Sequence, residues 1–100
     1  MTALDFIRGQ VGERELYAQL AEEATELAHA ALKMRRTLSN ENPTPVQKDD
    51  AHKALLEECA DVVLCMRALN LWTLTTWLQV KLIMRRKLFR WIRRLRGERQ

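Results

Sequence analysis

The chain has 100 residues, 47% of them hydrophobic and 30% charged, which is an ordinary composition for a globular domain. This length fits one domain spanning residues 1–100 and leaves little room for a second. The net charge of +4 is unevenly distributed, because residues 81–100 hold nine basic side chains and one acid, whereas residues 1–80 carry a net charge of −4. The two parts of the chain are therefore expected to meet different partners.

Secretion and membrane insertion are both disfavoured by the sequence. The first ten residues lack the basic segment and apolar run of a signal peptide. The most apolar window, residues 69–84, contains polar and charged side chains and is too short to span a bilayer. Cys59 and Cys65 fall on different sides of a helix, which suits reduced thiols better than a disulfide or a metal pair. We therefore expect a cytoplasmic protein.

The first long helix is predicted over about residues 13–37. Gly9 and Gly12 interrupt the first dozen residues, and no glycine or proline follows until the loop near residue 40. Apolar residues then recur at steps of four and three, as in a helix that buries one face. This predicted stripe consists of Leu16, Leu20, Ala24, Leu27, Ala31, Met34 and Leu38.

The second helix has two candidate starting points. Thr44 followed by Pro45 resembles an N-cap with proline at the first helical position, and Gln47 would complete a capping box. Asp49 or Asp50 is the alternative, since acids favour a first helical turn. We expect the helix to reach about residue 69, with a buried stripe of Leu55, Cys59, Val62, Met66 and Leu69.

A turn is expected at residues 70–73, followed by a basic helix over about residues 74–96. Its apolar positions again step by four and three: Trp77, Val80, Met84, Leu88, Trp91 and Leu95. The predicted fold is all-α, a helical bundle of three main helices per chain. Since a chain this short buries a limited core, we expect oligomerisation to complete the bundle.

A similar phrase occurs in each of the first two helices, as LAEEATELA at residues 20–28 and LLEECADVV at residues 55–63. Each phrase begins with a leucine, Leu20 or Leu55, which serves as the reference direction on its helix. With about 100° per residue, Glu23 and Glu58 both lie about 60° from that leucine, and Glu26 and Asp61 both lie about 120° from it, on the same side. In an antiparallel pair of helices these four carboxylates would face one another beside the apolar seam.

Four carboxylates in one partly buried place repel each other unless a cation lies among them. Oxygen ligands without histidine or cysteine suit a hard ion, Mg²⁺ or Mn²⁺. His29 and His52 are predicted to be surface residues. The alternative is an acidic face that is simply solvated, because acids at this spacing are common on exposed helices.

The motif Glu22-Glu23-x-x-Glu26 followed by Glu58-x-x-Asp61 resembles the signature of the MazG-like, all-α nucleoside triphosphate pyrophosphohydrolases. The likeness also covers the NPTPV loop and the terminal KLFRWIRRL, although the spacer between the two motifs is longer than in the family and the last helix richer in tryptophan.

This resemblance implies a homodimer or homotetramer that hydrolyses (d)NTPs to monophosphate and pyrophosphate with Mg²⁺, for which Mn²⁺ could substitute. It assigns the metal to Glu23, Glu26, Glu58 and Asp61, and Glu22 is the additional acid. Glu22 or Glu26 could accept a proton from the attacking water. Candidates to bind the phosphates are Lys33, Lys87 and Arg90, and candidates to stack on the base are Tyr17, Trp72 and Trp77.

A rival function is binding through the basic C-terminal segment. An arginine-rich amphipathic helix attracts nucleic acid, and similar helices lie on anionic membranes or fit a partner's groove. The duplicated acids would repel nucleic acid and anionic lipid, so they favour the nucleotide hydrolase over this alternative.

Overall fold

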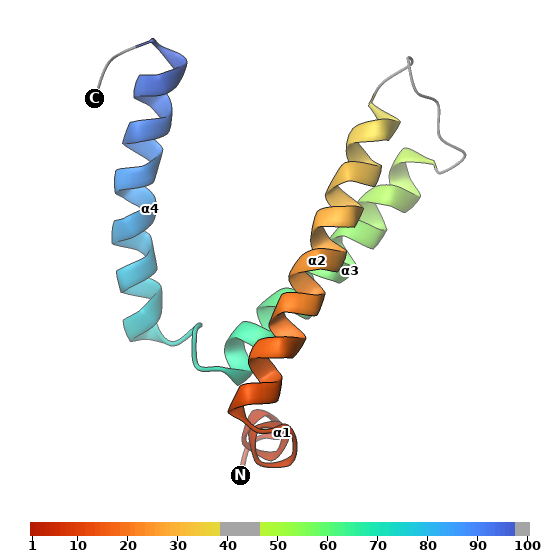
Figure 1. Ribbon diagram of the computed structural model, residues 1–100, viewed down its shortest axis with the longest axis vertical. Coiled ribbons are helices and arrows are strands. Elements are labelled where there is room, and N and C mark those ends of the chain that lie inside the picture. Colours follow the sequence, from red (N-terminus) through yellow and green to blue (C-terminus); the bar gives the residue numbers. More distant parts are fainter. Residues whose placement is uncertain (39–46, 98–100) are drawn as a thin grey trace. The chain divides into compact units, whose positions relative to one another are not determined.

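The computed structural model describes residues 1–38 and 47–97, and all regular structure within them is helical. Four helices follow one another (Figure 1): α1 (Ala3–Val11), α2 (Glu13–Thr37), α3 (Lys48–Ala68) and α4 (Leu74–Leu95). The predicted all-α fold class is confirmed for these residues. None of their helices combines the length and the hydrophobicity that a membrane span requires.

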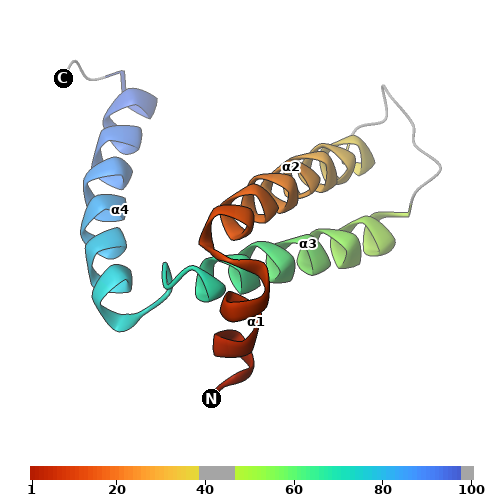
Figure 2. The ribbon, with the colours of Figure 1, turned by 60° about the horizontal axis from the view of Figure 1, so that its bottom comes forward.

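The chain divides into two units, residues 1–69 and residues 70–100. In the first unit α2 and α3 lie side by side as an antiparallel hairpin, and α1 packs against both of them (Figures 1 and 2). The second unit contains α4.

The boundaries of the long helices agree closely with the sequence prediction. Helices α2 and α4 match the predicted ranges, and α3 ends one residue before the predicted Leu69. Helix α3 begins at Lys48 with Gln47 as its N-cap, so Asp49 and Asp50 lie in its first turn. The alternative cap at Thr44 lies outside the described residues.

Helix α1 is a fourth helix beside the three main helices that the sequence predicts, and it runs through Gly9 and ends before Gly12. Thr2 and Asp5 form a capping box, in which the Asp5 N–H donates to Thr2 Oγ1 at 3.1 Å and the Thr2 N–H donates to Asp5 Oδ2 at 3.0 Å. Gly9 costs a helix interior about 1 kcal/mol relative to alanine, which the cap and the packing against the hairpin offset. Gly12, at φ 86°, supplies the left-handed conformation that separates α1 from α2.

The hairpin seam on α2 is rotated relative to the predicted stripe. Ala24, Ala31 and Leu38 are exposed, contrary to the prediction. The partly or fully buried positions are Leu16, Leu20, Glu23, Leu27, Ala30, Met34 and Thr37. This series also steps by four and three, so the spacing of apolar residues alone does not separate the two registers. The observed register places a carboxylate, Glu23, within the seam.

Small residues dominate the buried positions of the first unit. Of the described residues only Leu16, Ala30, Ala51 and Ala68 are buried, and three of these four are alanines. Alanines let two helices approach closely but bury little apolar area. The predicted stripe of α3 is half-buried along its whole length, which agrees with its expected position at the packed face.

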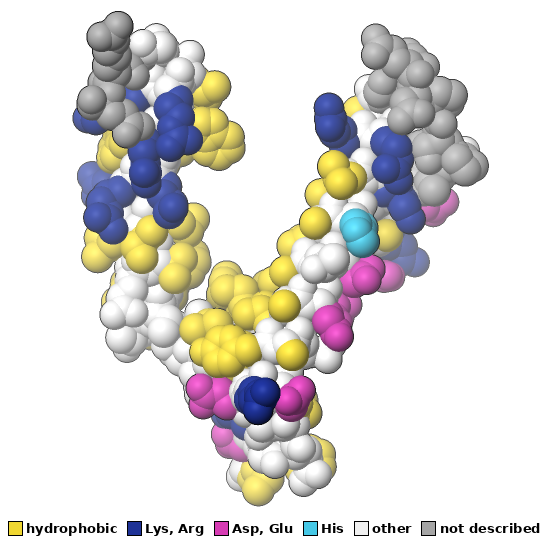
Figure 3. All heavy atoms as spheres, in the orientation of Figure 1, with side chains coloured by type: hydrophobic (Ala, Val, Ile, Leu, Met, Phe, Trp, Pro, Cys, Tyr) yellow, Lys and Arg dark blue, Asp and Glu magenta, His cyan; other side chains and the backbone are white. Residues whose placement is uncertain are grey.

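Helix α4 is amphipathic, with its apolar residues at the predicted spacing, and belongs to a unit of its own. All six predicted stripe residues are exposed, and no residue of α4 is buried. The helix begins on a local signal, a capping box between Thr73 and Thr76. Lysine and arginine side chains gather along it beside exposed hydrophobic ones (Figure 3). Its secondary structure is therefore explained by its own sequence, whereas its apolar face has no cover among its own residues.

Candidate metal centre

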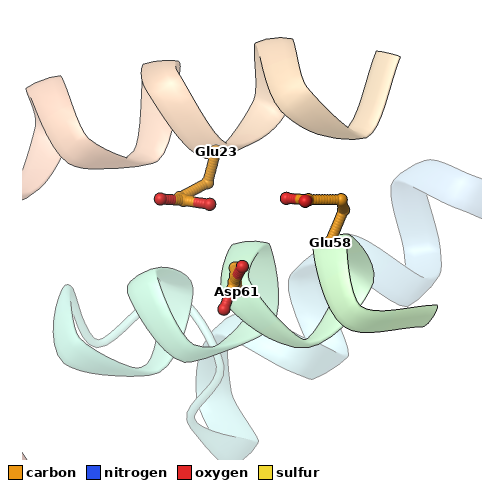
Figure 4. Close-up of side chains that lie close together, drawn as sticks. All are labelled: Glu23, Glu58 and Asp61. Carbon is orange, nitrogen blue, oxygen red and sulfur yellow. The ribbon is translucent and has the colours of Figure 1, made fainter. Parts of the chain in front are cut away.

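Three of the four predicted metal ligands meet between α2 and α3. Each of Glu23, Glu58 and Asp61 offers one carboxylate oxygen, and these three oxygens lie within 4.8 Å of one another. Figure 4 shows Glu23 extending from α2 toward Glu58 and Asp61 on α3. Glu23 and Glu58 are half-buried and Asp61 is exposed, so the cluster lies at the edge of the seam.

The hairpin register brings this cluster together. Glu58 and Asp61 are three residues apart and therefore share one face of α3. Glu23 occupies a seam position between Leu20 and Leu27, which turns its side chain toward α3. In addition, Gln19 Nε2 donates a hydrogen bond to Glu23 Oε1 at 2.8 Å and so holds one oxygen of that carboxylate.

The surroundings of Glu58 disfavour its ionised form. Partial removal from water, together with the negative charges of Asp61, Glu23, Glu26 and Glu57, raises the pKa of Glu58 above its ordinary range. A cation among these groups would reverse the effect, because it favours the ionised carboxylate.

Glu26, the fourth predicted ligand, does not join this group. It lies one helical turn beyond Glu23, its side chain is exposed, and its charge still reaches Glu58. Glu22 is exposed on α2 beside Glu23. Glu26 therefore lies near the cluster of three, whereas Glu22 is placed only by its exposure on α2, and the roles predicted for both acids remain predictions.

The donor set fits a hard divalent cation. All three groups are carboxylates, the ligands preferred by Mg²⁺ and Mn²⁺. With bonds of about 2.0–2.1 Å, an octahedral Mg²⁺ separates its ligand oxygens by at most about 4.2 Å, which is close to the 4.8 Å within which the three oxygens lie. The open side at Asp61 leaves room for water or phosphate oxygens.

An open cavity of about 250 Å³ adjoins the carboxylates within the first unit. Helix α1 contributes Ile7 and Val11 to its lining; α2 contributes Leu16, Gln19 and Glu23; α3 contributes Asp61, Leu64, Cys65 and Ala68. Burial, followed by the charges of Glu23 and Asp61, raises the pKa of the Cys65 thiol. The cavity thus has an apolar wall and an acidic edge.

Helix α1 is held beside this cavity by Arg8. Its Nε donates to the carbonyl oxygen of Ala68 at 2.6 Å, and its NH2 group donates to that of Arg67 at 3.2 Å. These are carbonyls of the last turn of α3, where helical carbonyls lack internal partners and a cation is favoured. Arg8 also forms a salt bridge with Asp5 at 2.6 Å.

The residues predicted to contact the phosphates or the base are not members of the carboxylate cluster. Lys33 is exposed near the end of α2, while Lys87 and Arg90 are exposed on α4, which belongs to the second unit. Trp72 and Trp77 face each other, with ring centroids 5.5 Å apart and planes inclined at 43°. Nothing described here assigns these residues to a substrate.

Sequence reasoning did not single out Arg8, Gln19 or the cavity. The capping pattern at Thr2 and Asp5 is a readable signal for α1, and a helix there would have directed attention to Arg8. The position of Gln19 four residues before Glu23 is also a known geometry for side-chain pairing on one helix face. The cavity itself depends on how three helices meet, which no local pattern specifies.

The fold and the cluster define a helical protein with an acidic, cation-compatible site in a helix hairpin. Comparisons with protein-family models, with curated proteins and with solved structures each found no match for this chain. The motif resemblance therefore has no independent support from these comparisons.

Proposed function

We propose that this protein is a Mg²⁺-dependent hydrolase that converts (d)NTPs to the monophosphate and pyrophosphate. The observation that carries the proposal is the meeting of Glu23, Glu58 and Asp61 within 4.8 Å, from two phrases separated in the sequence. A solvated acidic face would not require an acid at a half-buried seam position, because alanine or leucine there would avoid charge repulsion.

In this proposal Glu23, Glu58 and Asp61 hold the cation, and Glu26 extends the negative surface toward the next turn of α2. A bound divalent ion neutralises phosphate charge and lowers the pKa of a coordinated water. Glu22 or Glu26 accepts a proton from the water that attacks the α-phosphorus, and the bond to the pyrophosphate leaving group breaks. Lys33, Lys87 and Arg90 remain candidates for contacts with phosphate oxygens.

The decisive experiment is product analysis with purified protein, Mg²⁺ and each common or modified dNTP and NTP. We expect monophosphate and pyrophosphate in equal amounts. Glu58→Gln and Asp61→Asn should each reduce turnover by at least about a hundredfold. Replacing a residue that only supports a metal ligand typically costs about 10- to 100-fold, so loss of a ligand itself should cost at least as much. Glu57→Gln, an exposed neighbour on the same helix, should retain most of the turnover.

Circular dichroism of the same variants separates chemistry from folding, since helicity should be unchanged. Retained turnover in both Glu58→Gln and Asp61→Asn would remove these carboxylates from the reaction. Absence of any hydrolysis by the unsubstituted protein, with Mn²⁺ as well as Mg²⁺, would reject the proposed activity.

A second candidate function is nucleic-acid binding by α4. The helix carries Lys81, Arg85, Arg86, Lys87, Arg90, Arg93 and Arg94 and no acidic residue. Such binding releases counterions and should weaken steeply as salt increases. Fluorescence anisotropy with labelled oligonucleotides tests it: Arg86→Gln combined with Arg90→Gln should weaken binding, while Asp61→Asn should not.

A further inference from the structure

We infer that the cavity beside the carboxylates is the subsite for the heterocyclic base of the nucleotide. This inference rests on the proposed hydrolysis of nucleoside triphosphates and adds the part of the substrate that the acids do not explain. Glu23 and Asp61 belong to both the carboxylate cluster and the cavity lining, so a ligand held at the cluster borders this space directly.

The chemistry of the lining suits an aromatic heterocycle. Ile7, Val11 and Leu64 contribute apolar side chains to the lining, and so do the buried residues Leu16 and Ala68. A phosphate group would not be favoured there, because Glu23 and Asp61 are negative and the rest of the wall offers no cation. The phosphates are therefore expected on the cation side, and the base on the apolar side.

The cavity is too small to enclose a whole nucleotide. Pockets that enclose drug-sized ligands measure about 300–1,000 Å³, and this cavity, at about 250 Å³, falls below that range. One ring system fits the space, while the triphosphate remains outside it at the open edge near Asp61.

Gln19 is the neutral polar side chain in the lining that can read the edge of a base. Its Nε2 already donates one hydrogen bond to Glu23 Oε1. An amide also carries a second N–H and a carbonyl oxygen, a donor and an acceptor side by side, which is the pattern a base edge can pair with. A base that pairs with Gln19 in the cavity would therefore contact the same side chain that holds the Glu23 carboxylate.

The chain contains its own probe of this cavity, because Cys65 lines it. Cys59→Ser leaves Cys65 as the cysteine that can react, and the rate of its reaction with a thiol reagent is measured. One set of samples contains α,β-imido nucleoside triphosphates, which resist cleavage at the α,β bridge. The other contains inorganic tripolyphosphate, which has no base. We expect at least a fivefold slowing by one or more nucleotides and none by tripolyphosphate. Equal reactivity in all conditions, or equal protection by both ligands, would overturn the assignment of the cavity.

A matched pair of variants on α3 adds a kinetic readout. Leu64 lines the cavity and is 52% exposed, whereas Leu56 does not line it and is 55% exposed, so tryptophan at either position should be tolerated by the fold. The ratio of kcat/KM for the best nucleotide to kcat/KM for tripolyphosphate should fall at least tenfold in Leu64→Trp and stay unchanged in Leu56→Trp. An unchanged ratio in Leu64→Trp would contradict the base subsite.

These two readouts separate the inference from the proposed function. Cys65 protection measures binding and needs no turnover, so it decides whether a base enters the cavity even if no triphosphate is hydrolysed. Conversely, hydrolysis without base-dependent protection would leave the proposed reaction standing and reject the cavity as the place of the base.

Discussion

Glu58 shows how one residue can be unfavourable for the fold and still have a reason to be present. It is half-buried in a seam where it faces the carboxylates of Glu23 and Asp61, and its pKa is raised by loss of water and by these charges. At neutral pH its ionised form weakens the hairpin unless a cation compensates. The residue therefore couples the stability of the hairpin to pH and to metal.

Glu58→Gln should make the metal-free protein more stable at neutral pH. Because the pKa of Glu58 is higher in the folded than in the unfolded state, the folded state binds this proton more tightly, and that stabilising contribution is lost as pH rises through the folded-state pKa. In chelator, we expect the variant to match the unsubstituted protein below about pH 4 and to melt at a higher temperature at pH 7.

Thermal unfolding followed by circular dichroism measures this difference, with Glu22→Gln as an exposed acid for comparison. Adding Mg²⁺ should raise the melting temperature of the unsubstituted protein more than that of Glu58→Gln, since only the former keeps all three carboxylates. A Glu58→Gln variant that is less stable than the unsubstituted protein in chelator at pH 7 would contradict the electrostatic explanation.

At the scale of helices, sequence reasoning succeeded where signals are local. The bounds of α2 and α4 follow from the positions of helix-breaking residues and from the helical spacing of apolar residues. Predicting them requires no tertiary information. The register of α2 could not be chosen in this way, because Leu16, Leu20 and Leu27 belong both to the predicted stripe and to the observed seam. The acid pattern was the better guide, since the matching positions of Glu23 and Glu58 indicate the faces that meet.

The contact between Arg8 and α3 joins the one unpredicted helix to the hairpin. Its guanidinium donates to the carbonyl oxygens of Arg67 and Ala68 at the C-terminal end of α3, where a positive charge is favoured. This contact positions α1 as one wall of the cavity, so it connects helix packing with the proposed base subsite.

Arg8→Gln should lower the free energy of unfolding by about 1.5–3 kcal/mol, the usual contribution of hydrogen bonds to a charged group. Urea denaturation measures it as a shift of the midpoint at constant slope. Arg14→Gln, at an exposed arginine in the first turn of α2, should change the value by no more than about 0.5 kcal/mol. Equal effects of the two substitutions would show that the Arg8 contact adds no stability.

Across the whole molecule, exposed apolar surface is abundant relative to the buried core. Four residues are buried among those described, three of them alanines, while large hydrophobic side chains such as Leu32, Leu56 and Leu88 are more than half exposed. Burial of this extent provides little of the apolar area on which the stability of a small domain depends. Association with further copies is the simplest way to cover the remaining surface.

We therefore expect the protein to form a homodimer or homotetramer in solution. Sedimentation velocity should give a mass of two or four chains, and the melting temperature should rise with protein concentration over roughly a hundredfold range, as mass action requires. Leu32→Glu places a charge on the exposed apolar surface of the hairpin and should shift the population toward monomer. A monomer with a concentration-independent melting temperature would contradict this expectation.

The arrangement of the three carboxylates also has a consequence for the lifetime of the hairpin. Glu58 and Asp61 lie on one helix and Glu23 on the other, so all three meet only after the hairpin has closed. Their repulsion is then largely absent from the transition state for closing and present in the closed state, so it acts mainly on the opening rate. At neutral pH the hairpin is expected to open and close often until a cation is bound, after which opening becomes slow. Binding of the ion would thus be visible first as slower exchange of the amide hydrogens near Glu23.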